Sequence, residues 1–376
     1  MNICNNKKIE RIAIIMAGGA GERFWPVSSR KRPKQFLRLT IGNKSLLEQT
    51  VTNISSVFSK GNTFIATGKH LVDSTKNADT GIPIKNIISE PFKRNTSGCI
   101  ALAAAEILAL YKNPDNIIMG VFPADHIIAD TQKFLLLLDA ALTAAERENA
   151  IVTFGIQPVR PETGYGYIQT TKDPEFSVGN VPVYRADMFC EKPDLKTAEE
   201  YMSTGQHFWN SGMFFWNLSA LLGELRKVAP ELLESVEQMA NAISSGDQKR
   251  LNAVFERLED ISIDYALMEK ADRVLVIKAD FGWDDIGAWD ALERTVPSDE
   301  YGNVIIGDSV IIDSKNCIVY NEQGPEKMNI GVIGVNGLAV IVSGEGVLVL
   351  PKEKAQDVRR VVTELKKRNP DDTVKN

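Results

Sequence analysis

The sequence predicts an α/β protein with an open, mostly parallel sheet, and a small β-rich unit that ends in a helix. Apolar runs without alternation, typical of strands buried on both faces, lie at residues 12–16, 63–66, 117–122, 150–154 and 274–278. Helical patterns lie between several of these runs, including residues 98–111 and 133–147. Strands that alternate with helices form βαβ units, so we expect an open sheet covered by helices.

The middle of the chain has a different character. Residues 161–169 are rich in glycine and tyrosine, and residues 206–216 are rich in aromatic and small residues. These segments predict loops and short strands inserted beside the edge of the sheet. A further helical stretch is expected at residues 218–239.

A change in pattern after Val296 predicts two domains, at residues 1–296 and 297–376. Turn residues and short β-prone runs follow, and three isoleucines lie six residues apart, at Ile306, Ile312 and Ile318. This is the spacing of a hexapeptide β-helix, although ordinary strands and turns also produce it. Residues 353–367 predict a final helix whose apolar face contains Val358, Val361, Val362 and Leu365.

The composition limits the classes of function. The chain has 376 residues, 44% hydrophobic and 24% charged, as in ordinary globular proteins. A net charge of −6 argues against a general nucleic-acid binder but leaves phosphate substrates open. The four cysteines are too far apart for a zinc or CxxC motif, and the apolar run at residues 12–17 is too short to span a membrane. We therefore expect a cytoplasmic protein without nucleic-acid or membrane partners.

A glycine-rich segment, GGAGERFWPVSSRKRPKQF, follows the first strand at residues 18–36. Such a turn exposes backbone N–H groups that can surround phosphate oxygens, and Arg23 and Lys34 add positive charge. The segment lacks the third glycine of the dinucleotide fingerprint, because Phe24 stands there. A P-loop would end in GK followed by serine or threonine, but the pair Gly68-Lys69 is followed by His70. The first glycine of the P-loop motif is also missing, because Thr63 stands in its place. The pattern thus argues against a dehydrogenase and a P-loop protein.

Carboxylates follow two other predicted strands. Asp125 follows the strand at residues 117–121, and residues 280–287 read DFGWDDIG. Ligands of open α/β sheets bind at the carboxyl ends of strands, and carboxylates there suit Mg²⁺, which prefers oxygen ligands. Taken alone, Asp125 is also compatible with a helix cap or turn. The three histidines are scattered, which argues against zinc.

The glycine segment resembles the signature of the sugar nucleotidyltransferases, and its FWP and PKQF strings are similar to those of the mannose-1-phosphate guanylyltransferases. Further matching strings lie at residues 161–168, 189–193 and 209–214. The resemblance implies a Rossmann-like fold of the nucleotide-diphospho-sugar transferase type. It also implies Mg²⁺ on Asp125 and Asp285, with Asp284 orienting its neighbour. The implied reaction is GTP plus mannose 1-phosphate giving GDP-mannose and pyrophosphate, without a covalent intermediate.

With this resemblance we expect the catalytic residues Arg23, Lys34, Asp125, Lys192 and Asp285. Nucleotide contacts are expected from the loop, the strand ends and a helix start: Ala17, Gly18, Gly19, Gly21, Glu22, Arg23, Lys34, Glu90, Gly98, Pro123 and Asp125. Sugar contacts are expected from Gly164, Tyr165, Glu191, Lys192, Asn210 and Gly212.

The chemistry of the ligands supports individual roles. A hexose needs carboxylate and amide partners for its hydroxyls and a cation for its phosphate, which suits Glu191, Asn210 and Lys192 respectively. The Glu191-Lys192 pair alone also fits an exposed ion pair. Guanine presents N–H donors on its pairing edge, so Glu90 is a candidate to read the base, although it also fits a surface glutamate. Asn95 or Thr96 is expected to cap the helix that follows.

Two rival functions share the signature. One is a nucleotidyltransferase for another nucleoside triphosphate and hexose 1-phosphate; the other is a non-catalytic nucleotide-sugar-binding subunit, which should lack Lys34, Asp125 or Asp285. All three residues are present. Some members of the family carry a fused isomerase domain, for which this sequence is too short, so we expect a single activity. The C-terminal segment of the family often pairs subunits, which makes a homodimer an expectation here.

Overall fold

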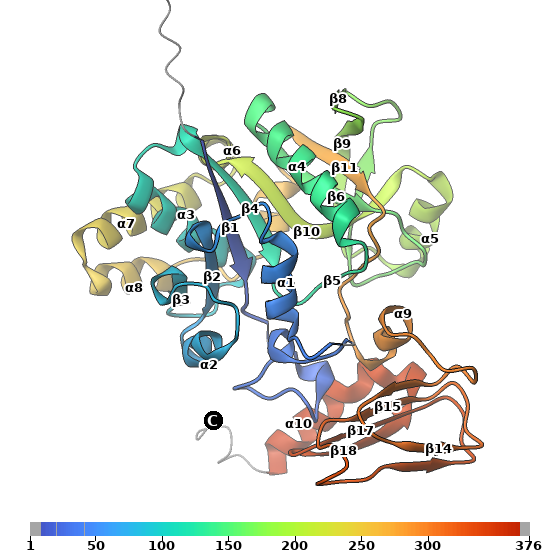
Figure 1. The fold of residues 1–376 in the computed structure, drawn as a ribbon. Coiled ribbons are helices and arrows are strands. Elements are labelled where there is room, and N and C mark those ends of the chain that lie inside the picture. The colour runs from blue at the N-terminus through green and yellow to red at the C-terminus, as the bar shows by residue number, and fades with distance from the viewer. Residues whose placement is uncertain (1–8, 20, 41, 369–376) are drawn as a thin grey trace, which may run out of the picture.

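The computed structural model describes residues 9–19, 21–40 and 42–368, so that Cys4 lies outside the described residues. A large α/β unit lies beside a smaller β-rich unit that carries the last helix, α10 (Figure 1). Their relative position matters for function, because the glycine-rich segment runs between them.

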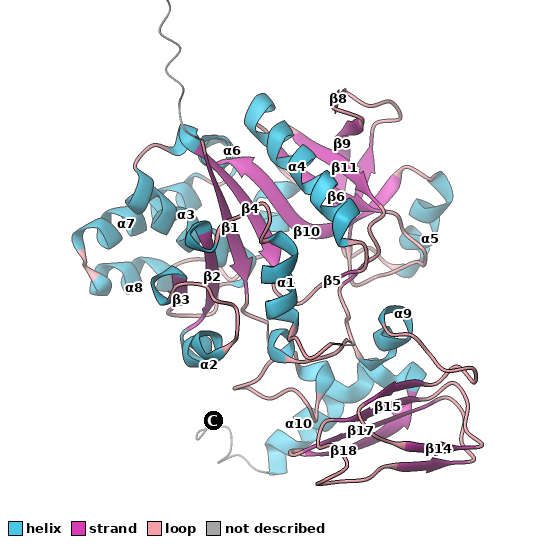
Figure 2. Cartoon of the chain, in the orientation of Figure 1, coloured by secondary structure: helices cyan, strands magenta, loops and turns pink. Residues whose placement is uncertain are grey.

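In the described part of the chain, ten strands form the main sheet in the order β3-β2-β1-β4-β10-β6-β11-β9-β7, with β8 paired to β9 (Figure 2). The bounds are β1 (Glu10–Met16), β2 (Thr63–Gly68), β3 (Ile87–Glu90), β4 (Ile117–Pro123), β6 (Ile151–Ile156), β7 (Gly166–Thr170), β8 (Phe176–Val178), β9 (Val181–Glu191), β10 (His207–Asn217) and β11 (Val274–Ala279). All five strands predicted from apolar runs are present.

The parallel part of the sheet positions the candidate site. β1 pairs in parallel with both β2 and β4, and β2 pairs in parallel with β3. The carboxyl ends of these strands therefore meet at one edge. The glycine-rich segment leaves β1 there, Glu90 ends β3, and Asp125 follows β4.

The aromatic segment predicted as loops and short strands beside the sheet edge is instead one long central strand, β10. It runs antiparallel between β4 and β6, which makes the sheet mixed. The strand is buried on both faces, but Asn210, Ser211 and Gly212 interrupt its apolar run and so conceal its length in the sequence. The register shifts between Asn210 and Phe214, where Gly212 has a φ of 69°. This irregularity is typical of a bulge that redirects side chains.

Helices cover both faces of the sheet (Figure 1). One apolar cluster joins α1 (Leu46–Ile54) and α4 (Thr131–Glu148) to one face. A second cluster joins α3 (Asn95–Tyr111), α6 (Leu218–Val228), α7 (Pro230–Ser245) and α8 (Gln248–Glu256) to the other. The short helices α2 (Val72–Asn77) and α5 (Leu195–Thr204) lie nearer the ends of the sheet.

Two details of the helices differ from the prediction. The stretch at 218–239 is two helices, because Ala229 has a non-helical backbone and Pro230 begins α7. The cap of α3 differs from the expected one: the N-cap residue is Arg94, whose side chain makes no capping bond, although the Asn95 side chain accepts a hydrogen bond from the N–H of Thr96 at 2.9 Å. The Thr96 hydroxyl instead accepts a hydrogen bond from the backbone N–H of Ile263, 2.8 Å away, and so ties the helix to a distant loop.

The C-terminal β unit consists of short strands that alternate between two sheets (Figure 2). The first sheet contains β13 (Val304–Ile306), β15 (Ile318–Asn321), β17 (Leu338–Ser343) and β18 (Gly346–Pro351); the second pairs β14 (Val310–Ile312) with β16 (Gly331–Ile333). All these pairs are parallel except β17 with β18. The three regularly spaced isoleucines fall in successive strands, as the β-helix prediction requires.

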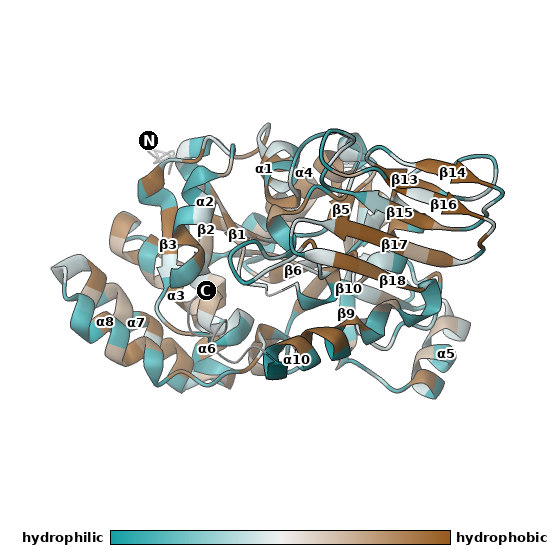
Figure 3. Ribbon diagram, turned by 90° about the horizontal axis from the view of Figure 1, so that it is seen from below, coloured by the Kyte–Doolittle hydropathy of each residue, from teal (hydrophilic) through white to brown (hydrophobic). Residues whose placement is uncertain are grey.

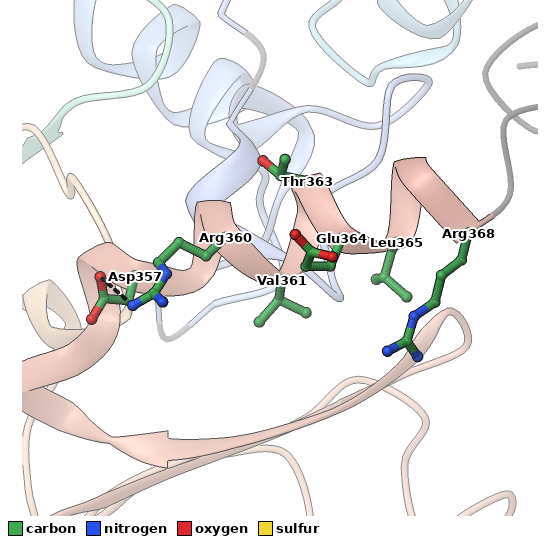
Figure 4. A pocket seen from close by; sticks show the side chains of 7 residues that line it. All are labelled: Asp357, Arg360, Val361, Thr363, Glu364, Leu365 and Arg368. Carbon is green, nitrogen blue, oxygen red and sulfur yellow. Dashed lines mark ion pairs between the residues drawn. The ribbon is translucent and has the colours of Figure 1, made fainter.

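The final helix begins later than predicted. Residues 352–357 form a 3-10 turn, and α10 spans Val358–Arg368. Val358 is buried, but Val361 is 36% exposed and Leu365 is half-buried. Figure 4 shows Val361 and Leu365 on the same side of α10, where they line a groove. Hence the predicted apolar face is only partly covered.

Candidate active site

The glycine-rich segment, residues 18–36, is called the signature loop below. It folds back on itself through two 3-10 turns, Glu22–Phe24 and Lys34–Phe36. Gly21 lies where the two turns meet, with a φ of 60°, and an added Cβ would stand 2.5 Å from the backbone nitrogen of Lys34. Only glycine fits this close approach. The loop thereby brings Arg23 and Lys34 to the same side of the sheet edge.

Lys34 is the centre of the candidate site. It is only 8% exposed, and its Nζ lies 2.9 Å from Oδ2 of Asp125. The same ammonium group donates a hydrogen bond to the backbone carbonyl of Asp285. A Cβ added to Gly19 would stand 4.0 Å from the Asp125 carboxylate. Residues from three distant parts of the sequence therefore surround one point.

The charge state of Asp125 follows from its neighbours. Burial alone would raise the pKa of this carboxyl, but the Lys34 ammonium group holds the pKa below its usual value. Burial lowers the pKa of His126, and its Nδ1 accepts a hydrogen bond from Nε1 of Trp283, 3.1 Å away. The site thus presents an ionised aspartate beside a neutral imidazole.

The two neighbouring aspartates of residues 280–287 have different partners. Asp284 forms a two-pronged ion pair with Arg294, at 2.6 and 3.1 Å, and accepts from the N–H of Ile286. Asp285 accepts a hydrogen bond from the hydroxyl of Tyr165. The strand pair β5 (Ile127–Ile128) and β12 (Trp283–Asp284) keeps this segment beside Asp125. Asp284 is therefore engaged by a cation, whereas the hydrogen-bond partner of the Asp285 carboxylate among the described residues is a neutral hydroxyl.

Arg23 reaches the same segment from the other side. Its Nη1 donates to the carbonyl oxygen of Gly287 at 2.9 Å, and burial lowers the pKa of the guanidinium. A Cβ on Gly287 would lie 3.4 Å from the same nitrogen. The signature loop and residues 280–287 are therefore in direct contact at Arg23 as well as at Lys34.

The donor set suits a hard divalent cation. Within the ranges that the structure describes, no three histidine, cysteine or acidic side chains gather around one point. Asp125 nevertheless places a carboxylate beside the Lys34 ammonium group, and the Asp285 carboxylate belongs to the residue whose backbone carbonyl meets the same ammonium group. Mg²⁺ typically takes one or two protein carboxylates and completes its shell with water and substrate phosphate. These two acids are of the type that Mg²⁺ requires.

A second group of polar residues lies where β7, β9 and β10 meet. Nζ of Lys192 lies 2.5 Å from Oε1 of Glu191, and a Cβ on Gly166 would stand 2.5 Å from the same carboxylate. The backbone N–H of Lys192 donates to the carbonyl of Tyr165 at 3.2 Å. Tyr165 therefore links this group to Asp285. The predicted residues Gly164 and Gly212 border the same region, and an added Cβ on Gly212 would lie 3.5 Å from Pro123.

The sequence prediction missed Asp264 in this group. Nδ2 of Asn210 donates to Oδ1 of Asp264 at 2.9 Å, and burial, with the nearby charge of Glu191, raises the pKa of Asp264 to about 6. The prediction also missed Arg160, whose guanidinium lies 5.0 Å from the ring centre of Trp209. A signal for Asp264 was present: a single acid among the apolar residues of 261–268, in a π-helical turn.

A third group surrounds Glu90 at the end of β3. This glutamate is 7% exposed, and burial raises its pKa to about 7. A Cβ on Gly18 would lie 3.6 Å from Oε1 of Glu90, so the start of the signature loop is adjacent. A Cβ on Gly98 would stand 2.4 Å from that of Arg94, which explains the glycine in the first turn of α3. The carbonyl of Ala17 accepts from Gln35 at 2.8 Å and so closes the base of the loop.

Comparison with known proteins shows the family to which the chain belongs. A family model described as nucleotidyl transferase matches residues 12–301, and one described as MannoseP isomerase/GMP-like beta-helix domain matches residues 307–365. The chain is 38% identical over 358 residues to a mannose-1-phosphate guanylyltransferase of Klebsiella pneumoniae, covering 94% of this chain and 74% of that protein. It is 37% identical over 364 residues to the alginate biosynthesis protein AlgA of Pseudomonas fluorescens, with coverage of 94% and 71%.

A crystal structure from Thermus thermophilus, described as a mannose-1-phosphate geranyltransferase, has a similar fold. It superposes with a TM-score of 0.82 at 35% identity, covering 95% of this chain and 100% of that one. The protein is thus an enzyme that belongs to the nucleotidyl transferase family. Within that family the chain belongs with the mannose-1-phosphate guanylyltransferases, which confirms the resemblance seen in the sequence.

In the described part of the chain, no helix combines the length and the apolar character needed to cross a bilayer.

Proposed function

We propose that this protein transfers GMP from GTP to α-D-mannose 1-phosphate, with magnesium, and releases pyrophosphate. The observation that carries the proposal is the position of Lys34, whose ammonium group meets the Asp125 carboxylate and the backbone carbonyl of Asp285 at the edge of the sheet where the signature loop begins. A buried ammonium group beside a carboxylate, next to a second acidic residue, is suited to crowded phosphates and their counter-ion. The membership of the family supports the same reaction class.

In this reaction an oxygen of the sugar phosphate attacks the α-phosphorus of GTP in line. A new P–O bond forms as the bond to the β-phosphate oxygen breaks, and the electron pair leaves with pyrophosphate. The attacking oxygen is already ionised at neutral pH, so the step needs no general base and no covalent enzyme intermediate. The main obstacle is repulsion between anions, so positioning and charge stabilisation should dominate catalysis.

The residues divide this task. Arg23 and Lys34 bind the triphosphate and stabilise the charge that develops on pyrophosphate, while Lys192 holds the phosphate of the sugar. Backbone N–H groups of the signature loop, which contains Gly18 and Gly19, supply further donors. Asp125 and Asp285 would hold Mg²⁺, which on binding neutralises phosphate charge and orients both substrates.

Recognition of the two organic groups falls to the remaining clusters. Glu90 accepts the N–H donors of guanine, beside Gly98. Glu191 and Asn210 bind sugar hydroxyls, and Gly164, Tyr165 and Gly212 shape the sugar pocket. Asp264, which orients Asn210 through a hydrogen bond, supports this pocket from behind.

A substrate panel tests the proposal. The protein is incubated with each of the four nucleoside triphosphates and with mannose, glucose and galactose 1-phosphates, and pyrophosphate and nucleotide sugar are measured. We expect turnover with GTP and mannose 1-phosphate that stops when a chelator removes Mg²⁺ and returns when Mg²⁺ is restored. Preferred turnover of another pair would replace the proposed substrates, and no turnover with any pair would reject the catalytic role of the site.

We also propose that the enzyme acts as a cytoplasmic homodimer assembled through its C-terminal β unit. The support is a set of exposed apolar residues on this unit: Val310, Ile312, Ile333, Val347, Val349 and Val361. Figure 3 colours much of β14, β16 and β18 as hydrophobic. Exposed apolar residues that gather on one unit are typical of association sites. Light scattering during gel filtration should give twice the chain mass, and a monomer at all concentrations would reject the dimer.

A further inference from the structure

The signature loop packs into the core of the C-terminal β unit. Apolar side chains of the loop and of the residues directly after it form one buried cluster with strands and the helix of that unit: Phe24, Val27, Leu37 and Leu39 with Ile318, Tyr320, Ala339, Ile341, Leu348 and Val358. Trp289 lies at the centre of the cluster. Its ring centroid is 5.1 Å from that of Phe24 and 5.3 Å from that of Tyr320. Burial of this apolar surface stabilises the contact between the loop and the unit.

Hydrogen bonds from the C-terminal β unit hold the backbone of the loop and of the segment that follows it. The hydroxyl of Ser343, in β17, donates to the carbonyl of Pro26 at 2.7 Å, and this bond is buried. The hydroxyl of Tyr320, in β15, donates to the carbonyl of Arg38 at 3.3 Å. These two acceptors lie on opposite sides of Lys34 in the sequence. The loop is therefore held at two points of the segment that carries its lysine.

Ion pairs at the surface add to these contacts. Nζ of Lys366, in α10, lies 2.7 Å from Oε1 of Glu22, and Arg32 pairs with Glu322. Both pairs are partly exposed, so each contributes little to stability. The pairs instead restrict the position of the loop close to its two cationic residues, because Glu22 directly precedes Arg23 and Arg32 lies two residues before Lys34.

We propose that the C-terminal β unit positions the catalytic loop, with Ser343 as the principal positioning residue. The inference rests on the proposed function, in which Arg23 and Lys34 bind the triphosphate. Displacement of a catalytic group by about 1 Å can cost roughly a hundredfold in rate. The Ser343 hydroxyl lies outside the main sheet and touches no substrate in the proposed reaction. It therefore affects turnover indirectly, through its hydrogen bond to the backbone of Pro26.

The chain offers a close control for this residue. Ser314 and Ser343 are both buried serines of the C-terminal β unit, 4% and 5% exposed. Each donates to a backbone carbonyl and accepts from a backbone N–H. The carbonyl that Ser314 binds belongs to Ile312, within the unit itself, whereas Ser343 binds the signature loop. Ser343→Ala and Ser314→Ala thus remove equivalent hydrogen bonds. Only the first of these bonds reaches the signature loop.

The test measures kcat, KM and thermal midpoint for both variants. We expect Ser343→Ala to lower kcat roughly tenfold, with the KM for mannose 1-phosphate unchanged, because the sugar pocket does not include the loop. Ser314→Ala should lower the thermal midpoint to a similar extent and retain kcat within about twofold. Equal kcat in the two variants would overturn the proposal, since the loss would then reflect stability alone.

Hydrogen exchange provides a readout that does not depend on the reaction. Peptides covering residues 22–38 should exchange faster in Ser343→Ala than in the wild type, and remain unchanged in Ser314→Ala. If the enzyme has no guanylyltransferase activity but these peptides respond as expected, the proposed function fails and the loop contact stands. If activity is present and the peptides do not respond, the positioning role fails.

The exposed ion pair gives a second test that does not disturb the core. Lys366→Ala removes the contact with Glu22, while Lys367→Ala removes a pair with Glu364 within α10. We expect the first to lower kcat about twofold and to speed exchange at residues 22–25, and the second to do neither. Identical behaviour of the two lysine variants, together with an unresponsive Ser343→Ala, would leave the C-terminal β unit without a role in catalysis.

Discussion

Nζ of Lys34 lies 2.9 Å from Oδ2 of Asp125, although 91 positions separate the residues in the sequence. The pair joins the signature loop to the end of β4 at the edge of the sheet where the parallel strands end. An ion pair in a largely buried place holds both charges in position before any ligand arrives, which is the preorganisation that phosphate chemistry requires.

Removal of this lysine should reduce turnover far more than stability. We expect Lys34→Ala to lower kcat by roughly 10²–10³, because one preorganised charge on the reacting phosphates is lost. Steady-state kinetics with GTP and mannose 1-phosphate check the rate, and circular dichroism checks the fold. The exposed Lys76→Ala, which removes only a surface pair with Asp73, serves as the control. Near-normal turnover in Lys34→Ala would remove the assigned role.

Substitutions of the neighbouring aspartates Asp284 and Asp285 should have different effects, the first on stability and the second on catalysis. We expect Asp285→Asn to lower kcat by roughly 10²–10³ and to raise the Mg²⁺ concentration needed for half-maximal rate. Asp284→Asn should instead destabilise the fold by about 1–3 kcal/mol, because Arg294 loses its two-pronged partner. Kinetics at varied Mg²⁺ and thermal unfolding of both variants distinguish the effects. The reverse pattern would reassign the metal ligand to Asp284.

Glu90 should make both stability and nucleotide binding depend on pH. The folded state retains the Glu90 proton up to about pH 7, whereas an ordinary glutamate releases it near 4.5. The folded state therefore binds more protons between these values, and the free energy of unfolding should fall as pH rises through this range. Glu90→Gln should remove this part of the slope, which denaturant titrations at several pH values can measure.

The same carboxyl should govern the affinity for GTP. Only the ionised form can accept both N–H donors of guanine, so the KM for GTP should fall as pH rises through about 7. Glu90→Gln should weaken the preference for GTP over ATP and flatten this pH profile. Full retention of the preference would show that another group reads the base.

Gly21 should not tolerate a side chain. We expect Gly21→Ala to lose about 1–2 kcal/mol through its left-handed backbone, and to lose turnover because the new Cβ would displace Lys34. Gly246→Ala is the matched control: its φ is 71°, and an added Cβ meets no described atom within 4 Å. That variant should show the backbone cost with normal kcat. Similar kinetics in both variants would contradict the steric argument.

The sequence predicted the parts of the fold that local pattern determines. Runs of apolar residues marked the parallel strands. Because the carboxyl ends of parallel strands lie at one edge of a sheet, Lys34, Asp125 and Asp285 were predicted to lie at that edge. β10 was predicted only as loops and short strands, because Asn210, Ser211 and Gly212 interrupt its apolar run. The break at Ala229 was hidden because the apolar pattern continues across it, although Pro230 marks a helix start.

The contacts of Asp264 and Ser343 could not be predicted from the sequence, for a different reason. Their partners, Asn210 and Pro26, are 54 and 317 positions away. Neither pairing follows from a strand-end rule, because each depends on how two separately folded segments pack. Such residues become visible only when the tertiary arrangement is known.

Trp283 has a consequence for experiments on this enzyme. Its indole contacts His126 through a hydrogen bond and lies 5.3 Å, centre to centre, from the ring of Tyr165, which itself binds the Asp285 carboxylate. The fluorescence of an indole depends on the charges and polarity around it. We therefore expect this indole to act as an optical probe of the proposed phosphate site, so that binding of a nucleotide or a metal ion changes the fluorescence of the protein without a label.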